Sequence, residues 1–242
     1  MIWYIYNQNQ KTLNNFVIVK SLGRGSFSKV KKVIRTYEDD GGKPITGEYA
    51  FKKMHKPTLL HERCVIYSKG GEIQMSNNLD KVYSEINIWA TLFHPNIARL
   101  YEVIDDPSHD YIYLVMELCD CGQLAKWSNE EKAYKRNESI VNDVYTWHLK
   151  GKELKNDTEK TEAVAKVLFA HQIKGLRHMH EETLVIHRDV KLDNLLYSSK
   201  DHNLKIIDFN VSYKLENPDA ILYDPEGTIS YRRKSIISSR MQ

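Results

Sequence analysis

Residues 187–194, His-Arg-Asp-Val-Lys-Leu-Asp-Asn, hold the side chains of this chain that are best suited to chemistry. Asp189 supplies a carboxylate that can accept or orient the proton of a hydroxyl group. Lys191, two residues later, can neutralise the charge of a phosphoryl group in transfer. Phosphoryl transfer depends mostly on positioning and charge compensation, so this stretch predicts that reaction.

Two oxygen-bearing side chains follow at informative distances. Asn194 lies five residues after Asp189, and Asp208 lies nineteen residues after it, within Asp-Phe-Asn. Amide and carboxylate oxygens are the hard ligands that Mg²⁺ prefers. A structural role alone explains this set poorly, because the spacing, the residue types and the predicted strand–loop–strand context agree. We therefore expect Asn194 and Asp208 to be metal ligands.

A glycine-rich segment, Gly23-Arg24-Gly25-Ser26-Phe27-Ser28-Lys29-Val30, lies between two β-branched runs. Its glycines let backbone N–H groups approach phosphate oxygens without a Cβ in the way. The flanking runs predict a hairpin, whereas a dinucleotide fingerprint needs a strand-to-helix turn, and no GxxxxGK[ST] pattern occurs. Ser28 replaces the third glycine, so an ordinary turn explains this segment, taken alone, about as well as a phosphate cradle.

Lys52 follows Ala50 and Phe51 in a predicted strand. On a strand, its side chain points away from the side chains of both neighbours. A lysine that binds the α- and β-phosphates of a nucleotide needs an acid to hold it, and Glu85, in a helix predicted over residues 80–93, is the candidate. Each of these two residues alone is explained as well by a solvated surface.

Taken in their order along the chain, these motifs resemble those of the protein kinase superfamily over about residues 16–232, with a hinge at residues 116–119. The motif with Lys191 two residues after Asp189 resembles that of serine/threonine kinases, because tyrosine kinases usually lack a lysine at this position. The resemblance implies transfer of phosphate from ATP to Ser or Thr of a protein substrate, with ATP and Mg²⁺ as cofactors. It also implies Asp189 as the base, Lys191 as the phosphate contact, and Lys52 with Glu85 as a pair.

The resemblance further implies a set of nucleotide-binding residues. Val30, Ala50 and Leu196 would enclose the adenine, Met116 would be the gatekeeper, and backbone groups of the hinge would bind the adenine edge. The whole set is Leu22, Gly23, Arg24, Gly25, Ser26, Phe27, Ser28, Val30, Ala50, Lys52, Met116, Glu117, Cys119 and Leu196.

Residues 85–119 are similar to the calcium/calmodulin-dependent protein kinase kinases and related upstream kinases of AMP-activated kinase. The similarity rests on Asp-Asp-Pro-Ser-His-Asp at 105–110, an insertion at 55–79 and Asp-Ala-Ile-Leu at 219–222. The insertion of that family is rich in Arg and Pro, and this one is not. The similarity implies an upstream kinase of a signalling cascade that has a regulatory partner.

Several positions depart from the kinase pattern. Asn210 replaces the usual glycine after Asp-Phe, and asparagine tolerates the left-handed backbone that the glycine normally adopts. We expect Asp224 or Glu226 to supply part of the negative charge that pairs with Arg188. The expected Ala-Pro-Glu does not follow the segment at 227–232, which predicts a C-terminally incomplete kinase.

The predicted fold class is α+β, a bilobal kinase-like fold with a β-rich N-lobe, a cleft, and a helical C-lobe truncated after the activation segment. Residues 1–15 would be an N-terminal extension and 16–242 the kinase domain. The N-lobe would cover about 16–118 and the partial C-lobe about 119–242, with loop-like insertions at about 55–79 and 126–158. A helix predicted over 160–181 would leave an apolar stripe exposed, because nothing follows to cover it; the stripe is Val164, Val167, Leu168, His171, Gly175, Leu176 and Met179.

Composition narrows the remaining classes of protein. The formal net charge of +3 gives no reason to expect nucleic acid as a partner, and no apolar run approaches the roughly 20 residues of a membrane span. Three cysteines make no disulfide framework, so a cytoplasmic or nuclear setting is expected. Zinc-type Cys/His spacing is absent. The alternative to an enzyme is a truncated or pseudokinase-like module that binds nucleotide or a partner without turnover.

Overall fold

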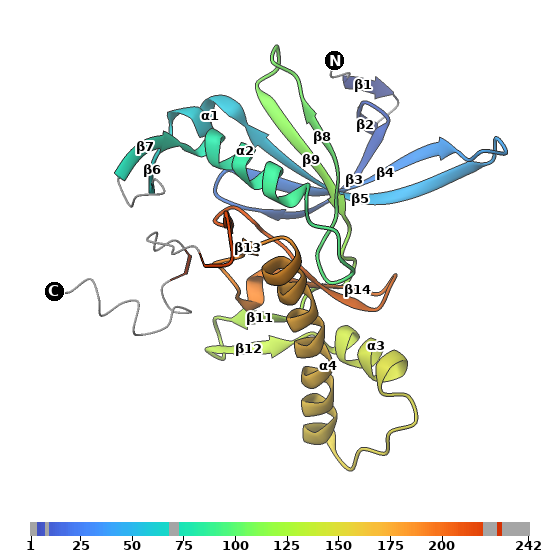
Figure 1. Ribbon diagram of the computed structural model, residues 1–242. Helices are drawn as coiled ribbons and strands as arrows, with labels where there is room; N and C mark the ends of the chain where they lie inside the picture. The colour runs from blue at the N-terminus through green and yellow to red at the C-terminus, as the bar shows by residue number, and fades with distance from the viewer. Residues whose placement is uncertain (1–3, 8–9, 68–72, 220–226, 229–242) are drawn as a thin grey trace. The chain divides into compact units, whose positions relative to one another are not determined.

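The computed structural model describes residues 4–7, 10–67, 73–219 and 227–228 (Figure 1). Contacts divide the chain into two compact units. The first comprises residues 1–65, 75–80 and 99–118, and the second comprises 66–74, 81–98 and 119–242. No helix in the described ranges is long and apolar enough to cross a membrane.

The first unit is built on a seven-stranded antiparallel sheet of order β1-β2-β3-β4-β5-β9-β8. The sheet buries a cluster that includes Val33, Phe51, Tyr113 and Val115, and Tyr113 and Val115 share a face because they are two residues apart on β9. The strands are β1 Tyr4–Asn7, β2 Gln10–Leu13, β3 Phe16–Arg24, β4 Ser28–Glu38, β5 Pro44–His55, β8 Leu100–Asp105 and β9 Tyr111–Glu117.

The second unit combines helices with short sheets. Its helices are α2 Asn78–Trp89, which begins in the first unit, α3 Glu138–His148, α4 Asp157–Arg177, the π-helical turn η1 His178–Glu182 and the 3₁₀ turn η2 Leu192–Asn194. Strand β14 Leu195–Ser198 pairs with β10 Gly122–Gln123 and with β15 Asn203–Ile206. The remaining pairs are β11 Ala125–Ser128 with β12 Ala133–Arg136, and β13 Val185–Ile186 with β16 Tyr213–Lys214.

The prediction of a loop over 55–79 was wrong, because this segment holds helix α1 Lys56–His61 and strands β6 Arg63–Tyr67 and β7 Ile73–Asn77. Pro57 lies in the first turn of α1, where a proline is tolerated because the first N–H groups have no partner within the helix. The side chain of His55 caps this helix by accepting a hydrogen bond from the Thr58 N–H.

The prediction of an irregular segment over 126–158 was also wrong. It contains β11, β12 and α3, and α4 begins at its end. Helix α3 buries only a narrow stripe, Ile140, Val141 and Val144, so its many polar residues hid the helical period. Asn137 caps the helix by accepting a hydrogen bond from the Ser139 N–H.

The two predicted helices are present, but their ends differ. Helix α2 ends at Trp89 rather than at 93, and Phe93 beyond it is 65% exposed. Helix α4 begins at Asp157, where the Asn156 side chain accepts a hydrogen bond from the Glu159 N–H. After Arg177 the chain continues as a π-helical turn.

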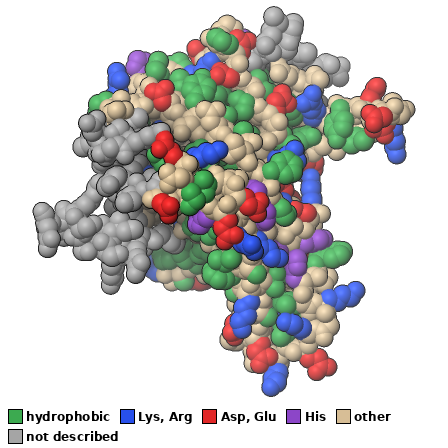
Figure 2. Space-filling view, in the orientation of Figure 1, with side chains coloured by type: hydrophobic (Ala, Val, Ile, Leu, Met, Phe, Trp, Pro, Cys, Tyr) green, Lys and Arg blue, Asp and Glu red, His purple; other side chains and the backbone are tan. Residues whose placement is uncertain are grey.

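The prediction that the apolar stripe of α4 is exposed was wrong, because the centre of the stripe is buried. Val164 and His171 are buried, and Gly175 lies so close to β15 that an added Cβ would be 2.8 Å from Ile206 Cδ1. The exposed large hydrophobic side chains of α4 are instead Phe169 and Ile173. Figure 2 shows charged and hydrophobic side chains mixed over the end of the unit that α3 and α4 form.

Candidate active site

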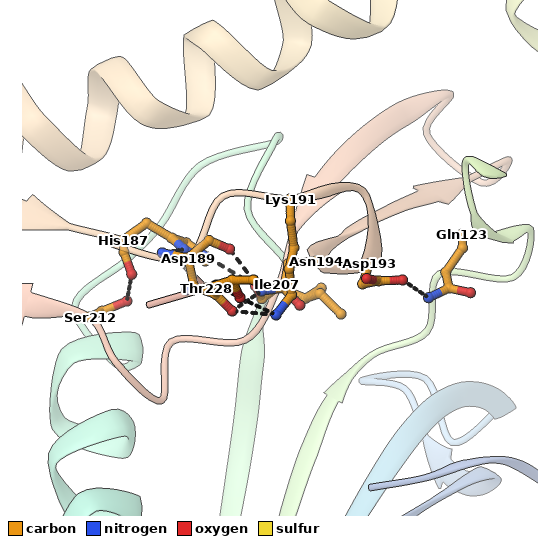
Figure 3. Close-up of polar contacts among 9 residues, drawn as sticks. All are labelled: Gln123, His187, Asp189, Lys191, Asp193, Asn194, Ile207, Ser212 and Thr228. Carbon is orange, nitrogen blue, oxygen red and sulfur yellow. Dashed lines mark hydrogen bonds and ion pairs between the residues drawn. The ribbon is translucent and has the colours of Figure 1, made fainter. Parts of the chain in front are cut away.

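The loop after β13 brings Asp189, Lys191 and Asn194 together (Figure 3). Asp189 is only 7% exposed. Its Oδ2 accepts hydrogen bonds from Lys191 Nζ at 2.7 Å and from Asn194 Nδ2 at 3.0 Å. Asn194 Nδ2 also donates to the Asp189 carbonyl oxygen at 2.9 Å, so the loop is closed on itself. Three residues that are close in sequence thus form one buried polar network.

Thr228 supplies the other half of this network. Its N–H donates to Asp189 Oδ1 at 2.9 Å, and its hydroxyl also donates to that oxygen. Lys191 Nζ donates to Thr228 Oγ1 at 3.0 Å. Gly227, just before it, has φ +107°, and a Cβ there would lie 2.1 Å from the Arg188 carbonyl oxygen. Only glycine fits this approach.

The pKa of Asp189 reflects two opposing effects. Burial raises it, but hydrogen bonds from Lys191 and Thr228 favour the charged form, and the net pKa is lowered from its usual value. Asp189 is therefore an anion at neutral pH, fixed in orientation by four donors. A fixed carboxylate of this kind can orient a hydroxyl group and accept its proton.

His187 holds the loop through hydrogen bonds at both ring nitrogens. It is buried, its Nδ1 accepts from the Asp189 N–H at 3.3 Å, and its Nε2 donates to the Ile207 carbonyl oxygen at 3.0 Å. Burial lowers its pKa, so the ring is neutral and its proton is on Nε2. The ring also meets Phe209 edge-on at 5.4 Å between centroids. These contacts give His187 a structural role in holding the loop.

The left-handed backbone expected at Asn210 occurs at Asp208 instead, where φ is +68°. Phe209 is fully buried between His187 and Trp89, whereas Asn210 is exposed. The chain turns before the buried ring rather than after it, and aspartate is among the few residues that tolerate this conformation. The expected reason for the departure at 210 was therefore wrong.

The donor set of the second unit fits a magnesium ion. The amide nitrogen of Asn194 is used by Asp189, which leaves its amide oxygen to face a cation. Asp208, half-buried, adds a carboxylate. Hard oxygens of this kind suit Mg²⁺. Nowhere in the described residues do three or more His, Cys, Asp or Glu side chains form a group that could hold a metal by themselves.

In the first unit, strand register places several predicted nucleotide-binding residues on one face of the sheet. Val30 lies opposite Lys52, and Ala50 lies opposite Met116. Lys52 and Ala50 are two residues apart and so share this face. Phe51, between them, points to the other face and is buried there. The alternation expected from sequence around Lys52 is therefore present.

The hairpin between β3 and β4 carries the glycine-rich segment. Gly23 lies opposite Val30, Arg24 lies opposite Lys29, and the Gly25 N–H donates to the Ser28 carbonyl oxygen at 2.9 Å. Leu22, Ser26 and Phe27, also predicted to bind nucleotide, are exposed. The segment is thus a strand-to-strand turn, as its flanking runs predicted.

The remaining predicted residues are distributed over both units. Glu117 ends β9, where its N–H donates to the Arg99 carbonyl oxygen at 2.9 Å and its carboxylate accepts from the Arg99 N–H. Cys119, Leu196 and Glu85 belong to the second unit. Glu85 is buried in α2, Leu196 lies in β14 opposite Lys205, and the Cys119 carbonyl oxygen accepts from the Gly122 N–H.

Asp224 and Glu226, the predicted charge partners of Arg188, lie outside the described residues. Arg188 itself has φ +65°, and its Nε donates to the Val211 carbonyl oxygen. Its guanidinium lies 5.5 Å from the centroid of the Tyr213 ring. These contacts hold Arg188 between the Asp189 loop and the segment after Phe209.

Residues 16–242 match the protein kinase domain. This chain belongs to that family. Its kinase domain is 30% identical over 216 residues to a probable serine/threonine-protein kinase of Dictyostelium discoideum, covering 89% of this chain and 24% of the relative. It is 34% identical over 218 residues to the serine/threonine-protein kinase GRIK2 of Arabidopsis thaliana, covering 90% and 43%.

A third relative is the calcium/calmodulin-dependent protein kinase kinase of Caenorhabditis elegans, 29% identical over 227 residues, covering 90% of this chain and 35% of the relative. The chain therefore spans less than half the length of these three relatives. The family and the serine/threonine class predicted from sequence are confirmed, as is the α+β kinase fold.

Sequence reasoning did not predict Thr228 as part of the kinase site. It contacts Asp189 from 39 residues away, and its only signal in the sequence was its place in the segment at 227–232 that precedes the missing Ala-Pro-Glu. Asp193 was also not predicted as a site residue. Its carboxylate accepts from Gln123 Nε2 at 3.4 Å, which links the loop to β10 (Figure 3).

Proposed function

We propose that this protein transfers the γ-phosphate of ATP to Ser or Thr residues of other proteins. The observation that carries the proposal is the buried, ionised Asp189 carboxylate, oriented by Lys191, Asn194 and Thr228. A module that only binds nucleotide or a partner does not need a carboxylate held in this way. The geometry therefore favours an enzyme.

In the proposed reaction, the oxygen of the acceptor hydroxyl forms a bond to the γ-phosphorus of ATP. The bond from that phosphorus to the bridging oxygen breaks, and its electron pair leaves with ADP. The proton of the acceptor passes to Asp189. Lys191, which lies 2.7 Å from the same carboxylate, offsets the charge of the phosphoryl group.

Asn194 and Asp208 are the proposed magnesium ligands, through the amide oxygen and the carboxylate. The ion supplies charge neutralisation on the phosphates when bound. Lys52, with Glu85 as its acid, is proposed to contact the α- and β-phosphates. The glycine-rich segment and the hinge are proposed to bind the rest of ATP; these residues are Leu22, Gly23, Arg24, Gly25, Ser26, Phe27, Ser28, Val30, Ala50, Met116, Glu117, Cys119 and Leu196.

The relatives support a finer proposal for the biological role. One of them is named a calcium/calmodulin-dependent protein kinase kinase. We propose that this protein is likewise an upstream kinase in a signalling cascade, that a regulatory partner controls it, and that it acts in the cytoplasm or nucleus. The N-lobe of the kinase is proposed to cover about residues 16–118 and the partial C-lobe about residues 119–242.

The acceptor class is tested with purified protein, radiolabelled ATP and three peptides that differ only in a central Ser, Thr or Tyr. We expect label on the Ser and Thr peptides and at least tenfold less on the Tyr peptide. Removal of magnesium with EDTA should abolish the label. Preferential labelling of the Tyr peptide, or transfer that is insensitive to EDTA, would contradict the proposal.

A further inference from the structure

Strands β3, β4 and β5 lie side by side in the sheet of the first unit (Figure 1), and each contributes cations to one face of that sheet. Arg24 of β3 lies directly opposite Lys29 of β4, and Lys29 lies directly opposite Lys53 of β5. Directly opposite residues of antiparallel strands share a face and have Cβ atoms about 5 Å apart. Lys31, two residues after Lys29, lies on the same face. We call Arg24, Lys29, Lys31 and Lys53 the basic patch.

The arrangement of the basic patch is unfavourable for the sheet by itself. Like charges that lie directly opposite each other on neighbouring strands destabilise a sheet. Lys29 has such a neighbour on both sides, in Arg24 and Lys53. An anion bound between these side chains would replace repulsion by attraction. Residues that break a local rule of stability in this way are expected at functional sites.

The charge of the basic patch is not cancelled by ion pairs. Residues 16–37 contain six cations and no acid. Two of the six have acidic partners elsewhere in the sheet; these pairs are Lys32 with Glu48 and Arg35 with Glu102. In the part of the chain that the structure describes, Arg24, Lys29 and Lys31 form no such pair. These three side chains therefore keep an uncompensated positive charge.

Lys53, the fourth member of the patch, is held in place by aromatic rings. Its ammonium lies 3.5 Å from the centroid of the Tyr111 ring and 5.7 Å from that of Tyr113. A cation over the face of an aromatic ring is attracted by the ring and keeps its charge. A site whose side chains stand on strands and are fixed in this way loses less conformational entropy on binding than a site on a free loop.

The size and composition of the basic patch favour a phosphate monoester as its ligand. Three neighbouring strands span about 10 Å, at about 4.8 Å between strands. A phosphorylated serine or threonine brings about two negative charges and three acceptor oxygens into this space, and its oxygens match the planar fork of Arg24. A single carboxylate brings only one charge. A nucleic-acid duplex distributes its charge along a track that is longer than the patch.

We propose that the basic patch binds a phosphoserine or phosphothreonine in a segment of another protein. Arg24 and Lys29 donate hydrogen bonds to the phosphate oxygens, and Lys31 and Lys53 form ion pairs with acidic residues beside the phosphorylated one. Recognition of phosphorylated segments by basic side chains of this kind is a recurring mode of peptide binding.

This binding site is separate from the proposed nucleotide site. Lys52, which is proposed to contact the phosphates of ATP, points to the opposite face of the sheet from Lys53, its neighbour in β5. The glycine-rich segment approaches nucleotide phosphates through its backbone N–H groups, so the side chain of Arg24 is available to the basic patch. Binding of a phosphorylated partner therefore does not rest on the proposed function.

Binding to the basic patch is tested by fluorescence anisotropy without ATP, using the fluorescein-labelled peptide Gly-Asp-Ala-phosphoserine-Ala-Asp-Gly and its unphosphorylated form. We expect saturable binding of the phosphopeptide, at least tenfold tighter than that of the unphosphorylated peptide. The double variant Lys29→Glu/Lys31→Glu should weaken this binding at least tenfold. The matched control is Lys43→Glu/Lys126→Glu, which makes the same change of charge at two exposed lysines outside the patch and should weaken binding less than twofold.

Thermal unfolding provides a second measurement with a milder variant, in case the charge reversal disturbs the sheet. Lys29→Gln removes the central cation, so without ligand its unfolding temperature should equal or exceed that of the unchanged protein. A saturating concentration of the phosphopeptide should raise the unfolding temperature of the unchanged protein, and should raise that of Lys29→Gln by less than half as much.

Four results would overturn the proposed binding. These are no saturable binding of the phosphopeptide, equal binding of the unphosphorylated peptide, equal weakening by the control variant, and equal thermal stabilisation of Lys29→Gln. Displacement of the phosphopeptide by phosphatidylserine vesicles or by a DNA duplex, at a lower concentration of phosphate groups, would instead assign the patch to a membrane or to nucleic acid. Absence of phosphate transfer from ATP to every acceptor, with phosphopeptide binding intact, would contradict the proposed function alone.

Discussion

Thr228 provides two of the four hydrogen bonds that orient Asp189 and help to lower its pKa. In Thr228→Ala the hydroxyl is lost, so the pKa of Asp189 should rise and its orientation should loosen. We expect kcat to fall at least tenfold. The acid limb of the pH–kcat profile should move to higher pH, because the carboxylate now protonates at a higher pH. Steady-state kinetics from pH 3 to pH 8 measures both changes, because the acid limb of a carboxylate whose pKa is lowered from 3.8 lies below pH 4.

The matched control for this prediction is Thr228→Ser, which keeps the hydroxyl and removes one methyl group. It should retain the acid limb of the unchanged protein. A Thr228→Ala profile that is merely scaled down, with its acid limb unmoved, would show that Thr228 does not act through Asp189.

A substitution at Gly227 tests whether the close approach of this residue to the Arg188 carbonyl oxygen is required for activity. In Gly227→Ala the new Cβ would lie 2.1 Å from the Arg188 carbonyl oxygen, and φ +107° would be strained as well. We expect a loss of stability of about 2 kcal/mol or more, together with at least tenfold lower kcat, because the Asp189 loop must move. Thermal unfolding and peptide kinetics measure the two effects.

Gly42→Ala is the control for backbone strain alone, because Gly42 has φ +77° but open space at its Cβ position. It should cost about 1 kcal/mol and leave kcat unchanged. Equal loss of kcat in the two variants would contradict the proposed contact at Arg188.

The sequence predicted the part of the site that is local along the chain. Asp189, Lys191 and Asn194 lie within six residues, so one loop brings them together and their types indicate their chemistry. Thr228 could not be predicted in the same way, because it arrives from a separate segment through tertiary contacts. The proton position on His187 likewise depends on Ile207, which sequence alone does not place beside it.

At the scale of elements, the substitution Gly175→Ala distinguishes the effect of helix propensity on stability from the effect of packing. Alanine favours a helix over glycine by about 1 kcal/mol. In α4, however, a Cβ at 175 would lie 2.8 Å from Ile206 Cδ1 and 3.0 Å from the Asn96 carbonyl oxygen. We expect Gly175→Ala to be destabilising by about 1–3 kcal/mol, because the backbone of Asn96 cannot move as easily as a side chain. Urea unfolding measures the free energy of unfolding.

Ala165→Gly, at an exposed position of the same helix, is the control for propensity. It should cost about 1 kcal/mol. If Gly175→Ala were stabilising by a similar amount, the close packing of α4 on β15 would be refuted.

Elements with a clear period were predicted, and those without one were not. The apolar spacing of α4 and the strand-like run of β9 gave strong signals. Helix α3 and the hairpin β11–β12 gave weak signals, because α3 buries only three residues and the hairpin is exposed on both strands. Their order comes from caps and anchors such as Asn137 and Arg136, which a periodicity search does not detect.

At the scale of the whole molecule, His171 makes stability depend on pH. Burial lowers its pKa to about 4 from a usual value of 6.5, and His148 and Lys174 add to this effect. Between pH 6.5 and pH 4 the unfolded chain binds a proton that the folded protein does not. Stability should therefore fall as pH falls through this window, by up to about 3 kcal/mol at pH 4. Urea unfolding at several pH values measures the slope.

His171→Gln removes the titrating ring and keeps a side-chain acceptor for the Leu204 N–H, which His171 Nδ1 accepts at 3.3 Å. This variant should lose most of the slope between pH 6.5 and pH 4, even if its stability at pH 7 is lower. A slope that is unchanged in the variant would assign the pH dependence to other groups.

The most direct test of the central claim, that Asp189 and its network perform phosphoryl transfer, is a single-turnover measurement at pH 7. The protein and its Asp189→Asn variant are mixed with labelled ATP, magnesium and a Thr peptide, and ADP affinity is measured in parallel. The account predicts that the variant binds ADP as the unchanged protein does but transfers phosphate at least 100-fold more slowly. Equal transfer rates in the two proteins would contradict it.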